Sequence, residues 1–220
     1  MTIDLKGRLV LIGAGKMGGA MLEGWLKAGI PATQIVVLDP APPAEVKALL
    51  QAVGVKHNPD VVSLTDAEVV LVAVKPQVMD DVLAPLRSLA VSKPLVLSVV
   101  AGKTIASLAH YFGGDAAIIR TMPNTPAAIG RGITAMAANA HVSKAQSALA
   151  EKLLLSIGEV VHVETESQID AVTAVSGSGP AMCFILQNAW QRLAKNWACS
   201  LPWLCNWHGP LWRVRVNSCG

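Results

Sequence analysis

The chain has 220 residues, of which 52% are hydrophobic and 15% are charged, and its formal net charge is +3. This length and composition predict a globular protein of one or two domains and exclude a disordered chain. No apolar run approaches the roughly 20 residues of a membrane-spanning helix, and the first residues do not resemble a signal peptide. We therefore expect a cytoplasmic protein with no membrane partner.

The net charge conceals a sharp break in composition near residue 182. Residues 1–181 carry all 15 acidic residues and 14 of the 18 basic ones, whereas residues 182–220 carry four basic residues and no acidic one. The same C-terminal stretch holds all four cysteines and five of the six tryptophans. The break predicts a boundary of some kind, and the slightly acidic body gives no reason to expect a nucleic acid partner.

Apolar runs of strand length alternate with segments of helical periodicity along the body. In chain order we expect a strand at 9–12, a helix at 17–28, a strand at 34–40, a helix at 45–54, a strand at 67–76, a helix at 79–90, a strand at 94–102, a helix capped by Thr104 at 104–112, strands at 116–126 and 131–138, a helix at 143–158 and a strand at 159–163. The run at 67–76 is too uniformly apolar for a half-exposed strand. The sequence therefore predicts an α/β fold, a Rossmann-type doubly wound and mostly parallel sheet covered by helices on both faces.

The first strand runs into the sequence "GAGKMG" at residues 13–18, which has the form G-x-G-x-x-G and opens the first helix. In this context Gly13 permits a tight turn, Gly15 lets the backbone approach a pyrophosphate, and Gly18 lets the helix pack closely on the strand. Free N–H groups and the positive end of the helix dipole would then meet the anion. The pattern predicts a dinucleotide site, and the alternative is a glycine turn with packing value only.

Asp39 ends the second predicted strand, 21 residues after Gly18. An acidic side chain here accepts hydrogen bonds from an adenosine ribose and repels a 2′-phosphate, which favours NADH over NADPH. The alternative is an aspartate that starts the turn before Pro40.

Four segments together resemble the pyrroline-5-carboxylate reductase family. They are "GAGKMGGAM" at 13–21, "AVKPQ" at 73–77, "RTMPNTPAAIGRGIT" at 120–134 and "IDAVTAVSGSGPA" at 169–181, and the resemblance covers roughly residues 8–181. It implies a Rossmann domain at 1–163, followed by the start of a helical domain at 164–200 that in the family builds the dimer and the substrate pocket. It also implies hydride transfer from NADPH to the C=N bond of 1-pyrroline-5-carboxylate, giving L-proline.

The resemblance also implies the roles of individual residues. Besides the three glycines and Asp39, it places these residues at the cofactor: Ala14, Lys16, Met17, Val74, Lys75 and Ala101. It places Asn124, Glu166 and Ser178 beside the reacting groups. Their structural alternatives are a turn residue for Asn124, a solvated loop carboxylate for Glu166, and a helix-capping role for Ser178 and its neighbour Ser176.

After Ala181 the chain departs from the family pattern, because no "SPGGTT"-like substrate-binding segment follows. We therefore expect an impaired catalytic pocket and a weak or absent family-type homo-oligomer. The C-terminal tail has three interpretations: a metal site formed by Cys199, Cys205, His208 and Cys219, a membrane-surface segment, or the product of a reading-frame slip that makes residues 201–220 aberrant. The cysteine spacing does not fit zinc sites and the prolines interrupt an amphipathic helix. We favour the frame slip, and expect an unstructured segment without a metal.

Two other functions stay open at this stage. One is a dinucleotide-binding module without catalysis, and the other is a Rossmann reductase for another small imine or hydroxy acid. The body contains no Ser-His-Asp, Cys-His or paired-carboxylate arrangement that would suggest a different mechanism.

Overall fold

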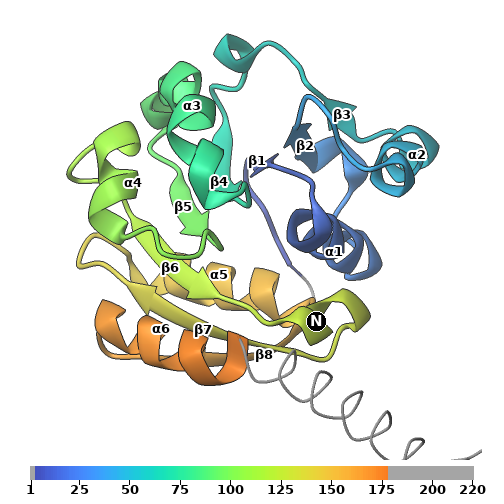
Figure 1. The fold of residues 1–220 in the computed structure, drawn as a ribbon. Coiled ribbons are helices and arrows are strands. Elements are labelled where there is room, and N and C mark those ends of the chain that lie inside the picture. The colour runs from blue at the N-terminus through green and yellow to red at the C-terminus, as the bar shows by residue number, and fades with distance from the viewer. Residues whose placement is uncertain (1–2, 178–220) are drawn as a thin grey trace, which may run out of the picture. The chain divides into compact units, whose positions relative to one another are not determined.

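The computed structural model describes residues 3–177, which form an eight-stranded sheet flanked by helices (Figure 1). The strands are β1 (Arg8–Ile12), β2 (Ile35–Leu38), β3 (Lys56–His57), β4 (Ala67–Val72), β5 (Leu95–Ser98), β6 (Ile118–Met122), β7 (Gly132–Ala138) and β8 (Gly158–His162). The α-helices are α1 (Lys16–Lys27), α2 (Ala44–Val53), α3 (Met79–Leu83), α4 (Ile105–Phe112), α5 (Lys144–Leu155) and α6 (Glu166–Val172). Short 3-10 helices connect several of them, and α6 continues into a π-helical turn, Thr173–Gly177.

The strand order is β3-β2-β1-β4-β5-β6-β7-β8, and the six strands from β1 to β6 are mutually parallel. The predicted doubly wound, mostly parallel sheet is thus confirmed. The direction of the chain reverses at β7, which pairs antiparallel with β6, and β8 then runs parallel to β7. The connection at residues 123–131 explains this reversal, because it is shorter than the dozen or so residues that a parallel crossover requires.

Both faces of the sheet are buried, because alternate residues of each strand point to opposite layers. Leu9 and Leu11 of β1 pack in the layer of α1, α2 and α5, whereas Val10 and Ile12 pack in the layer of α3 and α4. In the first layer Trp25 of α1 is fully buried, and its indole Nε1 donates to a backbone oxygen of α5 at 3.1 Å. The continuous apolar strands of the sequence therefore have the environment that a covered parallel sheet predicts.

Helix α6 packs against β6 and β7 (Figure 1). Its Ile169 is fully buried against Ala135 and Ala137 of β7, on the face opposite to α5. The described residues up to Gly177 form one compact unit. The domain boundary expected at residue 163 stays a prediction, and the expectations for residues 178–220 lie outside the described residues.

One predicted helix differs from its expected form. The segment expected at 79–90 begins as α3 and continues as a 3-10 helix from Ala84 to Ser92. Pro85 at the start of that 3-10 helix lacks the N–H group that a continuing α-helix would use.

The predicted cap of α4 is confirmed, because Thr104 Oγ1 accepts a hydrogen bond from Ser107 N at 3.2 Å. Among residues 3–177, no helix has the length and apolar character that crossing a bilayer demands.

Candidate active site

The order of strands reverses between β1 and β4, with the chain passing from β1 into α1 on one face and from β4 toward α3 on the other. In an open parallel sheet, ligands bind at such a switch point, beyond the carboxyl ends of the strands. Most of the residues that the sequence analysis predicted to bind the cofactor follow β1, β2, β4 or β5 at this edge. The sheet therefore brings the predicted cofactor residues to one end of the fold.

The glycine loop has the geometry that its sequence predicts. Gly13 has a φ of +87°, a conformation that residues with a side chain rarely adopt, and its N–H donates to Leu38 O at 2.9 Å. A methyl group added at Gly18 would lie 2.1 Å from the carbonyl oxygen of Gly13, so only glycine allows α1 to approach β1 this closely. At Gly15 an added methyl group would meet nothing within 4 Å. The backbone of the loop is therefore closely packed at Gly13 and Gly18, and it has free space beside Gly15.

The start of α1 carries uncompensated positive charge from its peptide dipoles. Gly15 is the N-cap residue and makes no side-chain cap hydrogen bond, and the first turn contains no acidic residue. Helix N–H groups in this position are ready to bind an anion. Lys16 is exposed in this turn and Met17 is partly buried, whereas Ala14 is fully buried. The open middle of the loop and the donor set together fit the pyrophosphate of a dinucleotide.

Asp39 follows β2 and contacts the glycine loop directly. Its Oδ2 accepts a hydrogen bond from Ala14 N at 2.7 Å, and its Oδ1 accepts one from Ala41 N at 2.9 Å. The second contact is the turn-initiating role considered for an aspartate before proline. The first contact places one carboxylate oxygen beside the phosphate loop, where a ribose-binding acid stands in dinucleotide folds. Both roles are therefore compatible within one side chain.

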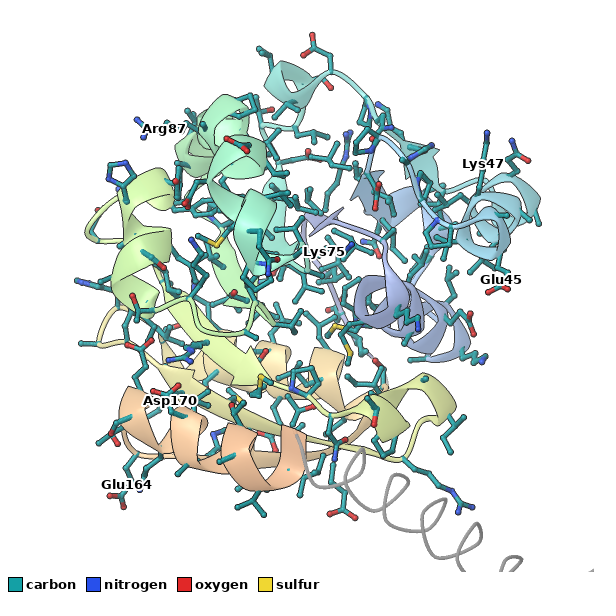
Figure 2. All side chains as sticks on the ribbon, viewed as in Figure 1. Glu45, Lys47, Lys75, Arg87, Glu164 and Asp170 are labelled. Atoms are coloured by element: carbon teal, nitrogen blue, oxygen red, sulfur yellow. The ribbon has the colours of Figure 1, made fainter. Side chains whose placement is uncertain are left out.

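Two further loops end at the same edge of the sheet. Val74 and Lys75 follow β4, and Figure 2 shows Lys75 near the centre of the view, between β4 and α1. Ala101 lies in an exposed turn after β5. Val74 is packed against the loop, since its Cγ1 would lie 2.8 Å from a methyl group at Gly13. These residues stand where the sequence placed them, and their contacts with a cofactor stay a prediction.

A polar cluster joins the β4 and β5 loops on the surface. Asp80, at the start of α3, accepts hydrogen bonds from Tyr111 Oη at 2.9 Å and from Lys103 Nζ at 3.2 Å. The Tyr111 hydrogen bond and, next, that of Lys103 hold the pKa of Asp80 below its ordinary value. Desolvation and the same contact with Asp80 raise the pKa of Tyr111. The cluster fixes the two loops relative to each other at the cofactor end of the sheet.

Asn124 is buried, with 9% of its surface exposed, and its amide is engaged within the protein. Its Oδ1 accepts from Ile133 N at 2.9 Å, and its Nδ2 donates to Ser176 Oγ at 3.3 Å. The amide oxygen thus contacts the backbone of β7, and a contact of Asn124 with the reacting groups stays a prediction. Ser178 lies outside the described residues, and so do Cys199 and His208. Within the described part of the chain, no group of three or more His, Cys, Asp or Glu side chains is arranged to hold a metal ion.

Glu166 belongs to an ion-pair network around the buried guanidinium of Arg120, which the sequence alone did not indicate. Arg120 of β6, whose side chain is 5% exposed, donates to Glu166 Oε1 at 3.1 Å and to Asp170 Oδ1 at 2.8 Å. Glu166 Oε1 also accepts from Ile105 N at 2.8 Å, the first residue of α4. Glu166 is thus held between α4, α6 and β6 rather than exposed on a loop. Figure 2 labels Asp170 on α6, near β7.

A second missed pair supports the end of β5. Thr121 Oγ1 of β6 donates to Ser98 O at 2.9 Å, and Ser98 Oγ accepts from Val100 N at 3.2 Å. Both side chains are buried. Polar residues inside apolar strands were the sequence signal that could have identified them, because buried hydroxyl groups require partners.

Comparison with known proteins agrees with this geometry. Residues 8–102 match the family model described as NADP oxidoreductase, coenzyme F420-dependent. Over 185 residues the chain is 40% identical to the pyrroline-5-carboxylate reductase of Pseudomonas aeruginosa, covering 83% of this chain and 67% of that protein. A pyrroline-5-carboxylate reductase structure from Coxiella burnetii matches with a TM-score of 0.78 at 31% identity, covering 87% and 72% of the two chains. A Plasmodium falciparum pyrroline carboxylate reductase structure with NADP bound has the same fold, with a TM-score of 0.71 at 24% identity over 84% and 67% of the two chains.

The doubly wound sheet, with a glycine loop at its switch point, defines an oxidoreductase that uses a nicotinamide dinucleotide. More particularly, the chain belongs to the pyrroline-5-carboxylate reductase family. The resemblance inferred from the four sequence motifs is confirmed.

Proposed function

We propose that the chain reduces the C=N bond of 1-pyrroline-5-carboxylate with a reduced nicotinamide dinucleotide and releases L-proline. The observation that carries the proposal is the glycine loop at the switch point of a chain 40% identical to a pyrroline-5-carboxylate reductase. Hydride transfer from the nicotinamide supplies two electrons to the imine carbon, and a proton from the medium completes the amine nitrogen.

The roles of the protein's own residues follow from their positions. Residues 13–18 hold the pyrophosphate through the backbone of the loop and the first turn of α1. The turn at Ala101 supports the nicotinamide end of the cofactor, and the Ser98–Thr121 pair fixes the strand end from which that turn departs. Asn124 and Glu166 act on backbone and side chains of the protein, so we assign them positioning roles beside the pocket. In this proposal the protein orients the nicotinamide ring and the pyrroline ring toward each other, and these residues do not act as acids or bases.

We further propose that NADH, rather than NADPH, is the preferred cofactor of this chain. The segment that follows β2 carries Asp39 directly after the strand and Glu45 in the first turn of α2, and its first basic residue is Lys47, further along that helix. A cation in this region accommodates the 2′-phosphate of NADPH in dinucleotide folds, whereas an acid binds the ribose hydroxyl of NADH. The carboxylate of Asp39 is held next to the phosphate loop by Ala14 N, which supports the second arrangement. NADPH, which the family resemblance implies, is the alternative.

Calorimetric titration of the full chain with NADH and NADPH tests this preference without requiring turnover. We expect NADH to bind more tightly than NADPH. Asp39→Ser should reduce the ratio of the Kd of NADPH to the Kd of NADH about tenfold, because it removes a charge that repels the 2′-phosphate. Asp39→Asn is the matched comparison, since it removes the charge and retains one acceptor for Ala14 N. A similar fall of the ratio in this variant would assign the effect to the charge and not to the lost hydrogen bond. Tighter binding of NADPH than of NADH to the unchanged chain would contradict the proposal.

Turnover is measured separately, as oxidation of NADH in the presence of 1-pyrroline-5-carboxylate. Binding accompanied by proline formation supports the reductase. Binding of the cofactor with no turnover of this imine would instead support the non-catalytic dinucleotide-binding module.

A further inference from the structure

Asn58, which directly follows β3, pairs with both backbone polar groups of Asp39. Asp39 N donates to Asn58 Oδ1 at 2.9 Å, and Asn58 Nδ2 donates to Asp39 O at 2.9 Å. The two residues are 19 positions apart in the chain. The contact therefore joins two separate loops at the cofactor end of the sheet.

The geometry explains why an asparagine occupies this position. Strand β3 has only two residues, and its backbone pairing with β2 ends at Val37 and His57. The side-chain amide of Asn58 presents one of its N–H groups and its oxygen side by side, much as a backbone does, so it extends the pairing to Asp39 in place of a third backbone partner. Asn58 has a φ of +47°, in the left-handed region that asparagine tolerates better than most residues. Its own N–H meanwhile donates to Val37 O at 2.9 Å.

This pairing fixes the backbone of Asp39, and the rest of its environment fixes the carboxylate. Oδ2 is bonded to Ala14 N and Oδ1 to Ala41 N. The following segment includes Pro40 and two further prolines, whose rings restrict the backbone. The side chain cannot turn away from the glycine loop without breaking hydrogen bonds. A carboxylate held in this way keeps its negative charge beside the glycine loop, where dinucleotide folds place the acid that binds the ribose.

We propose that Asn58 is a positioning residue for cofactor selection, which clamps Asp39 so that its carboxylate excludes a 2′-phosphate. The inference rests on the preference for NADH proposed above. His57 contributes less, because its Nε2 lies 2.9 Å from Asp39 O and it makes no contact with Asp39 N. Asn58 holds both backbone groups of Asp39, and so it fixes the position of the backbone from which the carboxylate reaches Ala14 N.

The test compares the Kd values of NADH and NADPH for the full chain and for Asn58→Gly. Glycine tolerates the positive φ, so this change removes the clamp without straining the backbone. We expect the discrimination against NADPH, measured as Kd of NADPH divided by Kd of NADH, to fall about twofold to tenfold, because the two lost hydrogen bonds act on the carboxylate only through the backbone of Asp39. Lys93→Gly is the matched control, because Lys93 also has a positive φ, of +48°, and lies at the end of a 3-10 helix after α3. That change should leave the ratio unaltered.

If Asn58 had a structural role only, Asn58→Gly would weaken the binding of both cofactors equally and leave the ratio of their Kd values unchanged. That result would overturn the inference. In an Asp39→Ser background, Asn58→Gly should no longer alter the ratio. If Asp39→Ser alone leaves the ratio unchanged, the proposed preference for NADH is wrong, and the clamp is overturned with it. If Asp39→Ser changes the ratio and Asn58→Gly does not, only the clamp is wrong. Asn58→Ser shortens the side chain and removes the paired amide without adding a charge, so the same fall in discrimination decides the question if the glycine variant fails to fold.

Discussion

Replacing Arg120 by methionine tests whether the ion-pair network holds α6 on the sheet. The guanidinium is almost completely buried and bonds to Glu166 and Asp170, while the two carboxylates are 31% and 69% exposed. Breaking a fully buried ion pair costs about 3–5 kcal/mol, whereas an exposed pair is worth about 0–1 kcal/mol. Glu166 retains its bond from Ile105 N and Asp170 relaxes into water, so we expect a loss of about 2 kcal/mol for Arg120→Met.

Urea denaturation followed by circular dichroism measures this loss as a change in the free energy of unfolding. Asp170→Asn is the control, because its exposed carboxylate should contribute less than about 1 kcal/mol. The double variant Arg120→Met with Glu166→Gln should lose less than the sum of the two single changes, since it leaves no unpaired charge at position 166 and the unpaired Asp170 is exposed to water. An Arg120→Met variant as stable as the unchanged chain, or an Asp170→Asn variant that loses as much, would refute the account of the network.

Two further changes test the loop and the surface cluster. Gly18→Ala should lower stability by about 1–3 kcal/mol and weaken dinucleotide binding, because its methyl group would overlap the carbonyl oxygen of Gly13. Thermal unfolding and calorimetric titration check this result, and unaltered binding would show that the close approach is unimportant. Asp80→Asn should reduce stability at neutral pH, and the difference from the unchanged chain should vanish as the pH falls through the lowered pKa of Asp80, below about pH 4. A difference that persists at lower pH would mean that Tyr111 and Lys103 do not act on the ionised carboxylate.

The parallel strands β1, β2, β4 and β5 were predictable because each is a mainly apolar run of strand length. The reversal at β7 was not, since periodicity does not encode the direction of a strand. It follows only from the short connection at residues 123–131 and its pairing with β6. Similarly, apolar periodicity at 79–90 predicts a helix, but the change to a 3-10 helix after Leu83 depends on the local effect of Pro85.

The candidate site divides in the same way. The glycine loop and Asp39 were found from the sequence because their chemistry depends on local turns and on fixed spacing. The partners of Glu166 were not, because Arg120 lies 46 residues away and becomes its neighbour only when α6 packs on β6. Asn58 gave no signal either, since its role depends on β3 ending beside Asp39. Contacts made by side chains across the fold require the structure.

The most direct test of the central claim follows the transferred hydride. The full chain is incubated with 1-pyrroline-5-carboxylate and NADH that carries deuterium at the transferring position, and the proline formed is examined by mass spectrometry. We predict L-proline with one deuterium at the carbon that belonged to the C=N bond. Binding of NADH without any deuterated proline would contradict the claim that this chain is a pyrroline-5-carboxylate reductase in function as well as in family.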